Sequence, residues 1–197
     1  TIETLSRSLG AKDQESQIHS IRVTEYAVRI AEEMKLTPPE IANIRTAATL
    51  HDIGKIGVSE EILDKSEKLR DEEIEHIHEH PLVAARILGP IDELKEIIEL
   101  IKHHHEWFDG SGYPDGLHED EIPLGSRIIA VADAFDAMTS SRPYRDALSE
   151  AHAVNEIRDH AGNQFDPAVV KAFMRSLGYD RAPAIPPENR SQLSPAG

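Results

Sequence analysis

The chain has 197 residues, a formal net charge of -15 and no cysteine, with 39% hydrophobic and 29% charged residues. The lack of cysteine excludes disulfide bonds and thiolate metal sites, so any metal needs nitrogen and oxygen ligands. The acidic excess argues against a nucleic-acid polymer as partner, because phosphate backbones demand clustered Lys and Arg. No apolar run approaches the ~18 residues of a membrane span, which predicts no membrane insertion and a cytoplasmic location.

Helical spacing of apolar residues runs through most of the chain, and no segment shows sustained period-two alternation, which predicts an all-α fold. We expect one domain over residues 1–180 and a disordered or extended tail over 181–197, where prolines replace apolar residues. Because the chain begins at Thr1, residues 1–12 are expected to form a lead-in helix joined to a missing upstream domain. Further helices are predicted over 14–35, 40–51, a short piece within 58–69, 71–77, 82–88, 91–105, 124–139, 150–161 and 167–177. Thr37 is expected to cap the helix over 40–51, and Asp71 the helix over 71–77.

One stretch gathers groups that could carry chemistry. Residues 103–106 read His-His-His-Glu, and a turn with three glycines around Pro114 follows at 110–116. Imidazoles gathered at a helix end are typical of metal ligands, and packing does not require three adjacent histidines there. A glycine-rich turn lets the backbone approach a ligand closely. The stretch therefore predicts half of a site, and the other half must come from elsewhere in the chain.

Other imidazoles and carboxylates lie at helix ends or on helix faces. His51 and Asp52 end an apolar helix, and adjacent residues on a helix point about 100° apart. The pair could therefore bracket two neighbouring ions, with the carboxylate bridging them. Lys55 follows His51 by four residues and could contact a phosphate. Glu15 and His19 are also four apart, so they share one face of a helix.

Two further residues complete this pattern. His80 precedes Pro81 at a helix junction, and Asp133 lies inside the apolar run 128–135, where a bare carboxylate is costly unless it is paired or bound to metal. Each also has a simpler explanation. Glu15 could lie on an exposed helix face, His80 could be an ordinary helix-end histidine, and Asp133 could pair with a core arginine. The joint pattern favours one polar centre. The histidines expected to be solvated or locally bonded are His76, His78, His103, His118, His152 and His160.

Two motifs resemble the signatures of the HD-GYP family, a branch of the HD metal-dependent phosphohydrolase superfamily. Residues 51–55 read His-Asp-Ile-Gly-Lys, and residues 104–114 contain His-His-Glu and Asp-Gly-x-Gly-Tyr-Pro. The similarity runs from about Asp13 to Pro167 in the family's order and spacing. It implies a multi-helix bundle with a central metal site. It also implies hydrolysis of the bacterial second messenger cyclic di-GMP to linear pGpG by a metal-bridging hydroxide, and leaves open whether hydrolysis continues to GMP.

The resemblance also implies a ligand set, in which Asp52 is the bridging carboxylate. Glu15 matches an extra glutamate found in members thought to hold three metals, so two or three divalent ions are expected. Imidazole and carboxylate ligands without sulfur suit iron, manganese or zinc, and the resemblance favours iron or manganese. The metal ligands implied are Glu15, His19, His51, Asp52, His80, His104, His105 and Asp133.

Substrate contacts follow from the same resemblance. Lys55, Arg142 and Arg145 match phosphate-binding positions, and Tyr113 would lie beside the substrate. The position of Arg145 is commonly lysine in the family. The positive charge is therefore kept, but a compact ammonium group is replaced by a planar guanidinium with forked N–H donors. The segment 64–68, Asp-Lys-Ser-Glu-Lys, departs from the more usual Lys-Pro-Gly-Lys, which bears on loop shape rather than chemistry. The residues expected to be catalytic are His51, Asp52 and Lys55.

Two other functions stay open. The first is hydrolysis of a mixed guanine–adenine cyclic dinucleotide, because the Gly-Tyr-Pro loop does not fix the bases. The second is a slow or inactive module that senses cyclic di-GMP or docks a synthase. Trp107 could stack on a base or belong to the core. The partners expected, besides cyclic di-GMP, are a diguanylate-cyclase-type or upstream sensory domain and a second copy in a homodimer.

Overall fold

The computed structural model describes residues 14–63, 65, 67–141 and 146–179. Over these ranges the chain is helical, with an isolated bridge between Ala161 and Phe165, so the predicted all-α class is confirmed. None of the described helices is both long and apolar enough to cross a lipid bilayer. The predicted lead-in helix, the predicted tail and the two arginines Arg142 and Arg145 lie outside the described residues.

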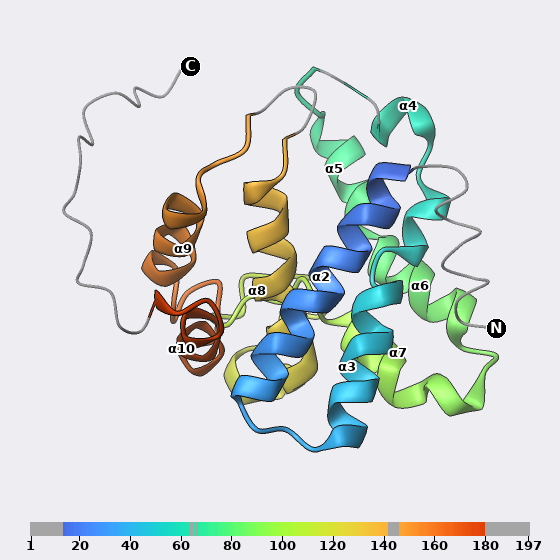
Figure 1. Ribbon diagram of the computed structural model, residues 1–197. Helices are drawn as coiled ribbons and strands as arrows, with labels where there is room; N and C mark the ends of the chain where they lie inside the picture. Colours follow the sequence, from blue (N-terminus) through green and yellow to red (C-terminus); the bar gives the residue numbers. More distant parts are fainter. Residues whose placement is uncertain (1–13, 64, 66, 142–145, 180–197) are drawn as a thin grey trace.

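Helix α2 runs through the middle of the molecule in Figure 1, with α3 against one side and α8 against the other. Helix α7 packs on α3 and α6, while α9 and α10 pack on α8. The elements in chain order are α2 (Gln14–Glu33), α3 (Pro38–Leu50), η1 (Ile53–Gly57), α4 (Glu60–Leu63), α5 (Asp71–His78), α6 (His80–Leu88), η2 (Asp92–Leu94), α7 (Lys95–Lys102), η3 (Glu119–Glu121), α8 (Leu124–Thr139), α9 (Glu150–Asp159) and α10 (Pro167–Ser176).

The start of α3 follows the predicted capping pattern. Thr37 is the N-cap, and both its backbone N–H and its hydroxyl donate to the Glu40 carboxylate, at 2.7 and 2.6 Å. Pro38 occupies the first helical position, where its missing N–H has no intrahelical partner to lose. The prediction that Asp71 caps α5 was wrong, because Arg70 is the N-cap and Asp71 is the first helical residue.

Two predicted boundaries near the site also differ from the structure. Helix α6 begins at His80, two residues earlier than expected. Proline is tolerated in the first turn of a helix, so Pro81 lies inside α6 and does not mark a break before it. The helix predicted to reach His105 ends at Lys102. There the imidazoles of His103 and His104 contact the last carbonyls of α7, those of Glu99 and Ile101, in place of further backbone N–H groups.

The apolar core lies between α2, α3, α8 and α10 and holds the ends of these helices in place. Phe135 packs edge-on against Tyr26 and Phe173, with ring centroids 4.9 and 5.0 Å apart. Ile30 and Ile44 are buried in the same cluster. Because a buried cluster is packed at near-crystal density, the polar groups at its edge are fixed in position. The candidate site is at this edge.

Candidate metal centre

Every predicted metal ligand whose side chain is described lies in one cluster. The cluster draws on α2, the end of α3, the start of α6, the segment after α7, and α8. Within each of its groups the potential ligand atoms lie within 4.8 Å of one another, and His51 and His104 each belong to two groups. Glu15 lies on α2, but its side chain is outside the described part of the chain. The groups are His80–His104–His105, His19–His51–Asp133 and His51–Asp52–His104.

Three of the imidazoles are oriented in the same way. The Nδ1 atoms of His51, His80 and His104 each contact the backbone carbonyl three residues earlier, at 2.8, 2.8 and 2.6 Å. When Nδ1–H donates to a carbonyl, the lone pair on Nε2 is left available for a ligand. All three Nε2 atoms are buried, and within the described residues none has a hydrogen-bond partner. Buried polar atoms are rarely left unpaired, so this donor set fits a bound metal.

Asp52 lies between the groups of the cluster. Its Oδ1 is 3.6 Å from His80 Nε2, whereas its Oδ2 is 3.5 Å from His51 Nε2 and 3.8 Å from His19 Nε2. The two oxygens therefore face different imidazoles, as a bridging carboxylate would. Oδ2 also accepts a hydrogen bond from Lys55 Nζ at 2.7 Å. Burial alone would raise the pKa of Asp52, but Lys55 and the surrounding imidazoles hold it well below its usual value.

His80, His104 and His105 have pKa values below the ordinary value for an imidazole. Burial lowers the pKa of His80 to about 4 and that of His105 to about 3, and it also lowers the pKa of His104. Neighbouring imidazoles add to the shift in each case. A neutral imidazole is the form that binds a metal, so these histidines are ready to act as ligands.

His19 is held by two carboxylates from α8. Its Nε2 is 3.2 Å from Asp133 Oδ1, and its Nδ1 is 2.7 Å from Asp136 Oδ2. Burial would lower the pKa of His19, but hydrogen bonds to Asp133 and Asp136 outweigh it and raise the pKa to about 9. Asp136 is 1% exposed and also pairs with Arg22. The pairing with an arginine that was considered for Asp133 is thus made by Asp136.

Asp136 did not appear among the sequence-predicted residues. It lies on the same apolar helix as Asp133, three residues later, so the cost of burying a bare carboxylate applied to it equally. Applying the same burial argument one helical turn further along would have identified Asp136.

The neighbours of the cluster occupy distinct positions. His103 has local partners, with Nδ1 3.0 Å from the Glu99 carbonyl oxygen and Nε2 3.0 Å from Asp115 Oδ2. The Tyr113 ring stacks between His105 and His78, with centroids 4.9 and 3.9 Å apart. His78 is exposed, as expected, but this stacking was not predicted. Burial, reinforced by the charge of Asp133, raises the pKa of the Tyr113 hydroxyl. The ring therefore stays neutral beside the centre.

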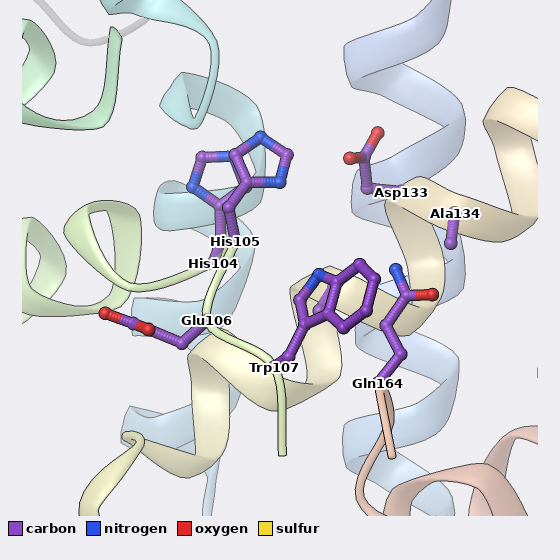
Figure 2. A pocket seen from close by; sticks show the side chains of 8 residues that line it. His104, His105, Glu106, Trp107, Asp133, Ala134 and Gln164 are labelled. Carbon is purple, nitrogen blue, oxygen red and sulfur yellow. The ribbon is translucent and has the colours of Figure 1, made fainter. Parts of the chain in front are cut away.

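A cavity of about 170 Å³ adjoins the centre. His104, His105 and Asp133 line one part of it, and Trp107 and Gln164 line another (Figure 2). The Glu106 carboxylate points away from these side chains in Figure 2 and accepts a hydrogen bond from the Asp115 backbone N–H at 2.7 Å. The site thus combines a polar ligand cluster with a partly apolar recess.

The HD domain family matches residues 3–169 of the chain. The chain belongs to the HD domain family. Its His-Asp and Gly-Tyr-Pro motifs place it in the HD-GYP branch, as the sequence predicted. Membership of this metal-dependent phosphohydrolase family, with the His and Asp cluster, indicates a metal-dependent protein.

Relatives in the family act on cyclic dinucleotides. A protein named cyclic di-GMP phosphodiesterase from Thermotoga maritima is 43% identical over 178 residues, covering 88% of this chain and 48% of that protein. A 3'3'-cGAMP-specific phosphodiesterase 3 from Vibrio cholerae is 36% identical over 176 residues, covering 89% of this chain and 38% of that protein. The chain therefore spans less than half the length of either relative.

Structural similarity supports the same fold. Bd1817, an HDG"Y"P protein from Bdellovibrio bacteriovorus, superposes with a TM-score of 0.64 at 21% identity, covering 81% of this chain and 51% of that chain. At this level of identity the likeness shows the fold alone. It agrees with the predicted multi-helix HD-domain bundle.

Proposed function

We propose that this chain is a metal-dependent phosphodiesterase domain that hydrolyses cyclic di-GMP to linear pGpG. The observation that carries the proposal is the cluster of buried Nε2 atoms of His51, His80 and His104, which have no hydrogen-bond partner among the described residues, around the carboxylate of Asp52. The 43% identity to the Thermotoga maritima cyclic di-GMP phosphodiesterase supports the choice of substrate.

The metal complement would be two or three ions, with iron or manganese favoured by the imidazole and carboxylate ligands. Asp52 would bridge two of them, since its oxygens face separate imidazoles. Glu15 lies four residues before His19 on α2 and would add a ligand for a third ion. Comparing the metal content of the wild type with that of Glu15→Ala tests this role. A loss of one ion per chain is expected, and an unchanged count of three would contradict it.

The chemistry needs no protein nucleophile. Divalent ions held by this cluster would supply Lewis-acid activation of water and of the phosphoryl oxygens. Lys55 would neutralise charge on the phosphoryl group. Its side chain is 36% exposed and its Nζ rests 2.7 Å from Asp52, so it lies at the centre while remaining open to solvent. Arg142 and Arg145 would bind phosphate together with Lys55, and Tyr113 would pack against the substrate beside His105.

A hydrolysis assay tests the proposal. Manganese-loaded protein is incubated with cyclic di-GMP, and linear pGpG and GMP are followed by chromatography. We expect pGpG from the wild type and a fall of at least about two orders of magnitude in His51→Ala and Asp52→Ala, because each change removes a ligand. His160→Ala is the matched control. That imidazole is exposed and contacts the Glu156 carbonyl at the end of α9. Tight binding of cyclic di-GMP without any product would contradict the enzyme proposal and favour the sensor alternative.

The mixed dinucleotide is the second candidate substrate. The Vibrio cholerae relative named for 3'3'-cGAMP supports it at 36% identity. Adding 3'3'-cGAMP and cyclic di-GMP together to one reaction gives the ratio of their kcat/KM values directly. We expect cyclic di-GMP to be consumed first, and the reverse order would assign the chain to the mixed substrate. An upstream sensory domain, a diguanylate-cyclase-type partner and a homodimer stay predictions.

A further inference from the structure

The recess beside the metal centre has a wall that the proposed hydrolysis leaves unused. Candidate ligands line one part of it, while Trp107 and Gln164 line another (Figure 2). We propose that Trp107 and Gln164 form a nucleobase subsite, which takes one purine of a cyclic dinucleotide bound at the metal centre. Gln164 would read the edge of that base. This inference rests on the proposed function and deepens it, because it names the residues that select the base.

Trp107 is placed as a stacking platform rather than as a core residue. It is 37% exposed and is not part of the buried apolar cluster. Its backbone is nevertheless fixed, because its carbonyl accepts the Gly110 N–H at 2.9 Å and its N–H lies against Gly112, where a Cβ would come within 2.2 Å. A partly exposed indole on a fixed backbone gives a nucleobase a large flat surface.

The backbone of Gln164 is held by hydrogen bonds on both sides. Its N–H donates to the His160 carbonyl at 3.1 Å, and its carbonyl accepts the Phe108 N–H at 3.2 Å. The second of these bonds ties the segment between α9 and α10 to the residue after Trp107. Within the described ranges the side-chain amide of Gln164 has no hydrogen-bond partner, although it is half-buried and lines the recess. A half-buried amide without a partner is suited to a ligand that supplies one.

The size of the recess fits one base. Its volume of about 170 Å³ lies below the roughly 300–1,000 Å³ of pockets that enclose a whole ligand. Ala130 and Ala134 on α8 contribute only methyl groups to its wall, which leaves space for a planar ring. His105 and Asp133 line the same recess. A phosphate at the metal centre would therefore bring its attached nucleoside to the mouth of the recess.

The donor and acceptor groups of the Gln164 amide determine which base edge it can recognise. A glutamine presents one acceptor oxygen and an NH₂ donor, which complement the N1–H donor and O6 acceptor of guanine. That pairing does not involve the exocyclic N2 amine of guanine. A glutamate at this position only accepts, so it would pair with N1–H and with N2–H₂. Gln164→Glu should therefore make recognition depend on N2.

This shift can be measured as a ratio. The kcat/KM values of cyclic di-GMP and of its analogue with hypoxanthine bases, which lack N2, are compared for the wild type and for Gln164→Glu. We expect the ratio to rise at least about fivefold in the variant, because a hydrogen bond to a charged group contributes at this level. The added negative charge affects both substrates and cancels in the ratio. Asn155→Asp, the same change on α9 away from the recess, should leave the ratio unaltered. An unchanged ratio in Gln164→Glu would overturn the role of Gln164.

A binding measurement tests the stacking surface without turnover. Trp107 is the only tryptophan of the chain, so its fluorescence reports this site alone. Manganese-loaded protein is titrated with GMP and, separately, with ribose 5-phosphate, which carries the phosphate but no base. We expect saturable quenching by GMP and none by ribose 5-phosphate, with the GMP affinity lowered in Gln164→Leu. Equal responses to the two probes, or none to either, would overturn the subsite.

The two proposals fail in different ways. Base-dependent quenching without hydrolysis of any cyclic dinucleotide would contradict the proposed function and leave the subsite standing. Hydrolysis of cyclic di-GMP without base-dependent quenching would contradict the subsite and leave the function standing.

Discussion

Asp136 lies one turn beyond Asp133 on α8 and contacts the side of the His19 ring that faces away from the cluster. Its Oδ2 is 2.7 Å from His19 Nδ1, and its buried carboxylate also accepts a hydrogen bond from Arg22. This contact fixes which nitrogen of His19 is turned towards Asp52 and Asp133. Carboxylates that orient a ligating histidine in this way raise its basicity and hold the ring in place.

We therefore expect Asp136→Asn to weaken metal binding without removing a ligand. The expected loss of manganese affinity is about 10–100-fold, measured by calorimetry on protein first stripped with chelator. Asp159→Asn is the matched control, since that carboxylate is half exposed at the end of α9. Equal affinities in the Asp136 and Asp159 variants would show that Asp136 does not position His19.

The histidines also predict how the metal-free protein responds to pH. The pKa values of His80 and His105, about 4 and about 3, lie below the ordinary value of 6.5. Between pH 6.5 and about 4 the unfolded chain therefore binds more protons at these positions, so the free energy of unfolding falls as the pH falls. His19 has the opposite sign. Its pKa of about 9 adds stability that is complete below pH 6.5 and is lost as the pH rises towards 9.

Urea unfolding of chelator-treated protein at pH 4.5, 6.5 and 9 checks this pattern. We expect the free energy of unfolding to be highest near pH 6.5 and to decline on both sides. A steady increase from pH 6.5 to 9 would contradict the role assigned to His19.

At the scale of elements, η1 and α6 contact each other through backbone at Gly54. A Cβ at this position would lie 1.9 Å from the His80 carbonyl oxygen and 2.7 Å from the Ala84 nitrogen. Backbone atoms cannot move aside as a flexible side chain can. The approach therefore sets the distance between Asp52, which precedes η1, and His80, which begins α6.

Gly54→Ala should separate these two elements. We expect the free energy of unfolding to fall by about 1–3 kcal/mol or more, and manganese affinity to fall with it, because His80 is displaced. Gly57→Ala is the matched control, since its Cβ would make an ordinary 3.5 Å contact with Val83 Cγ1. Similar stabilities for the two variants in urea unfolding would show that the close approach at Gly54 is not required.

The sequence predicted some elements more closely than others. The helix over 124–139 was predicted with its observed bounds, because Pro123 precedes an uninterrupted apolar repeat. The helix expected to reach His105 ended at Lys102, because the imidazoles of His103 and His104 bind its last carbonyl groups in place of backbone N–H groups. The spacing of apolar residues carries no information about such side-chain hydrogen bonds. Gln164 lies on a segment without a motif, and only the folded chain brings it beside Trp107.

At the scale of the whole molecule, an acidic chain with a net charge of -15 would have to bind an anionic substrate. The structure supports an explanation in which the charge near the site differs from the net charge of the chain. Lys55 and the ions that the ligand cluster would hold concentrate positive charge at one point, within a body whose acidic groups lie mostly elsewhere. The sequence predicted the candidate members of this centre from the combination of its His-Asp, His-His-Glu and Gly-Tyr-Pro motifs, since a lone His-Asp pair is a weak signal. The joint pattern also predicted one polar centre, but not which side chains group together within it, because that depends on how α2, α3, α6 and α8 pack.

Removal and return of the metal is the most direct test of the central claim. Protein stripped with chelator is assayed on cyclic di-GMP before and after addition of manganese or iron(II), with magnesium as a poorly matched ion for an imidazole-rich site. We expect no linear pGpG from the stripped protein, and restored hydrolysis with manganese or iron(II). Undiminished hydrolysis by protein shown to be free of metal would contradict the account.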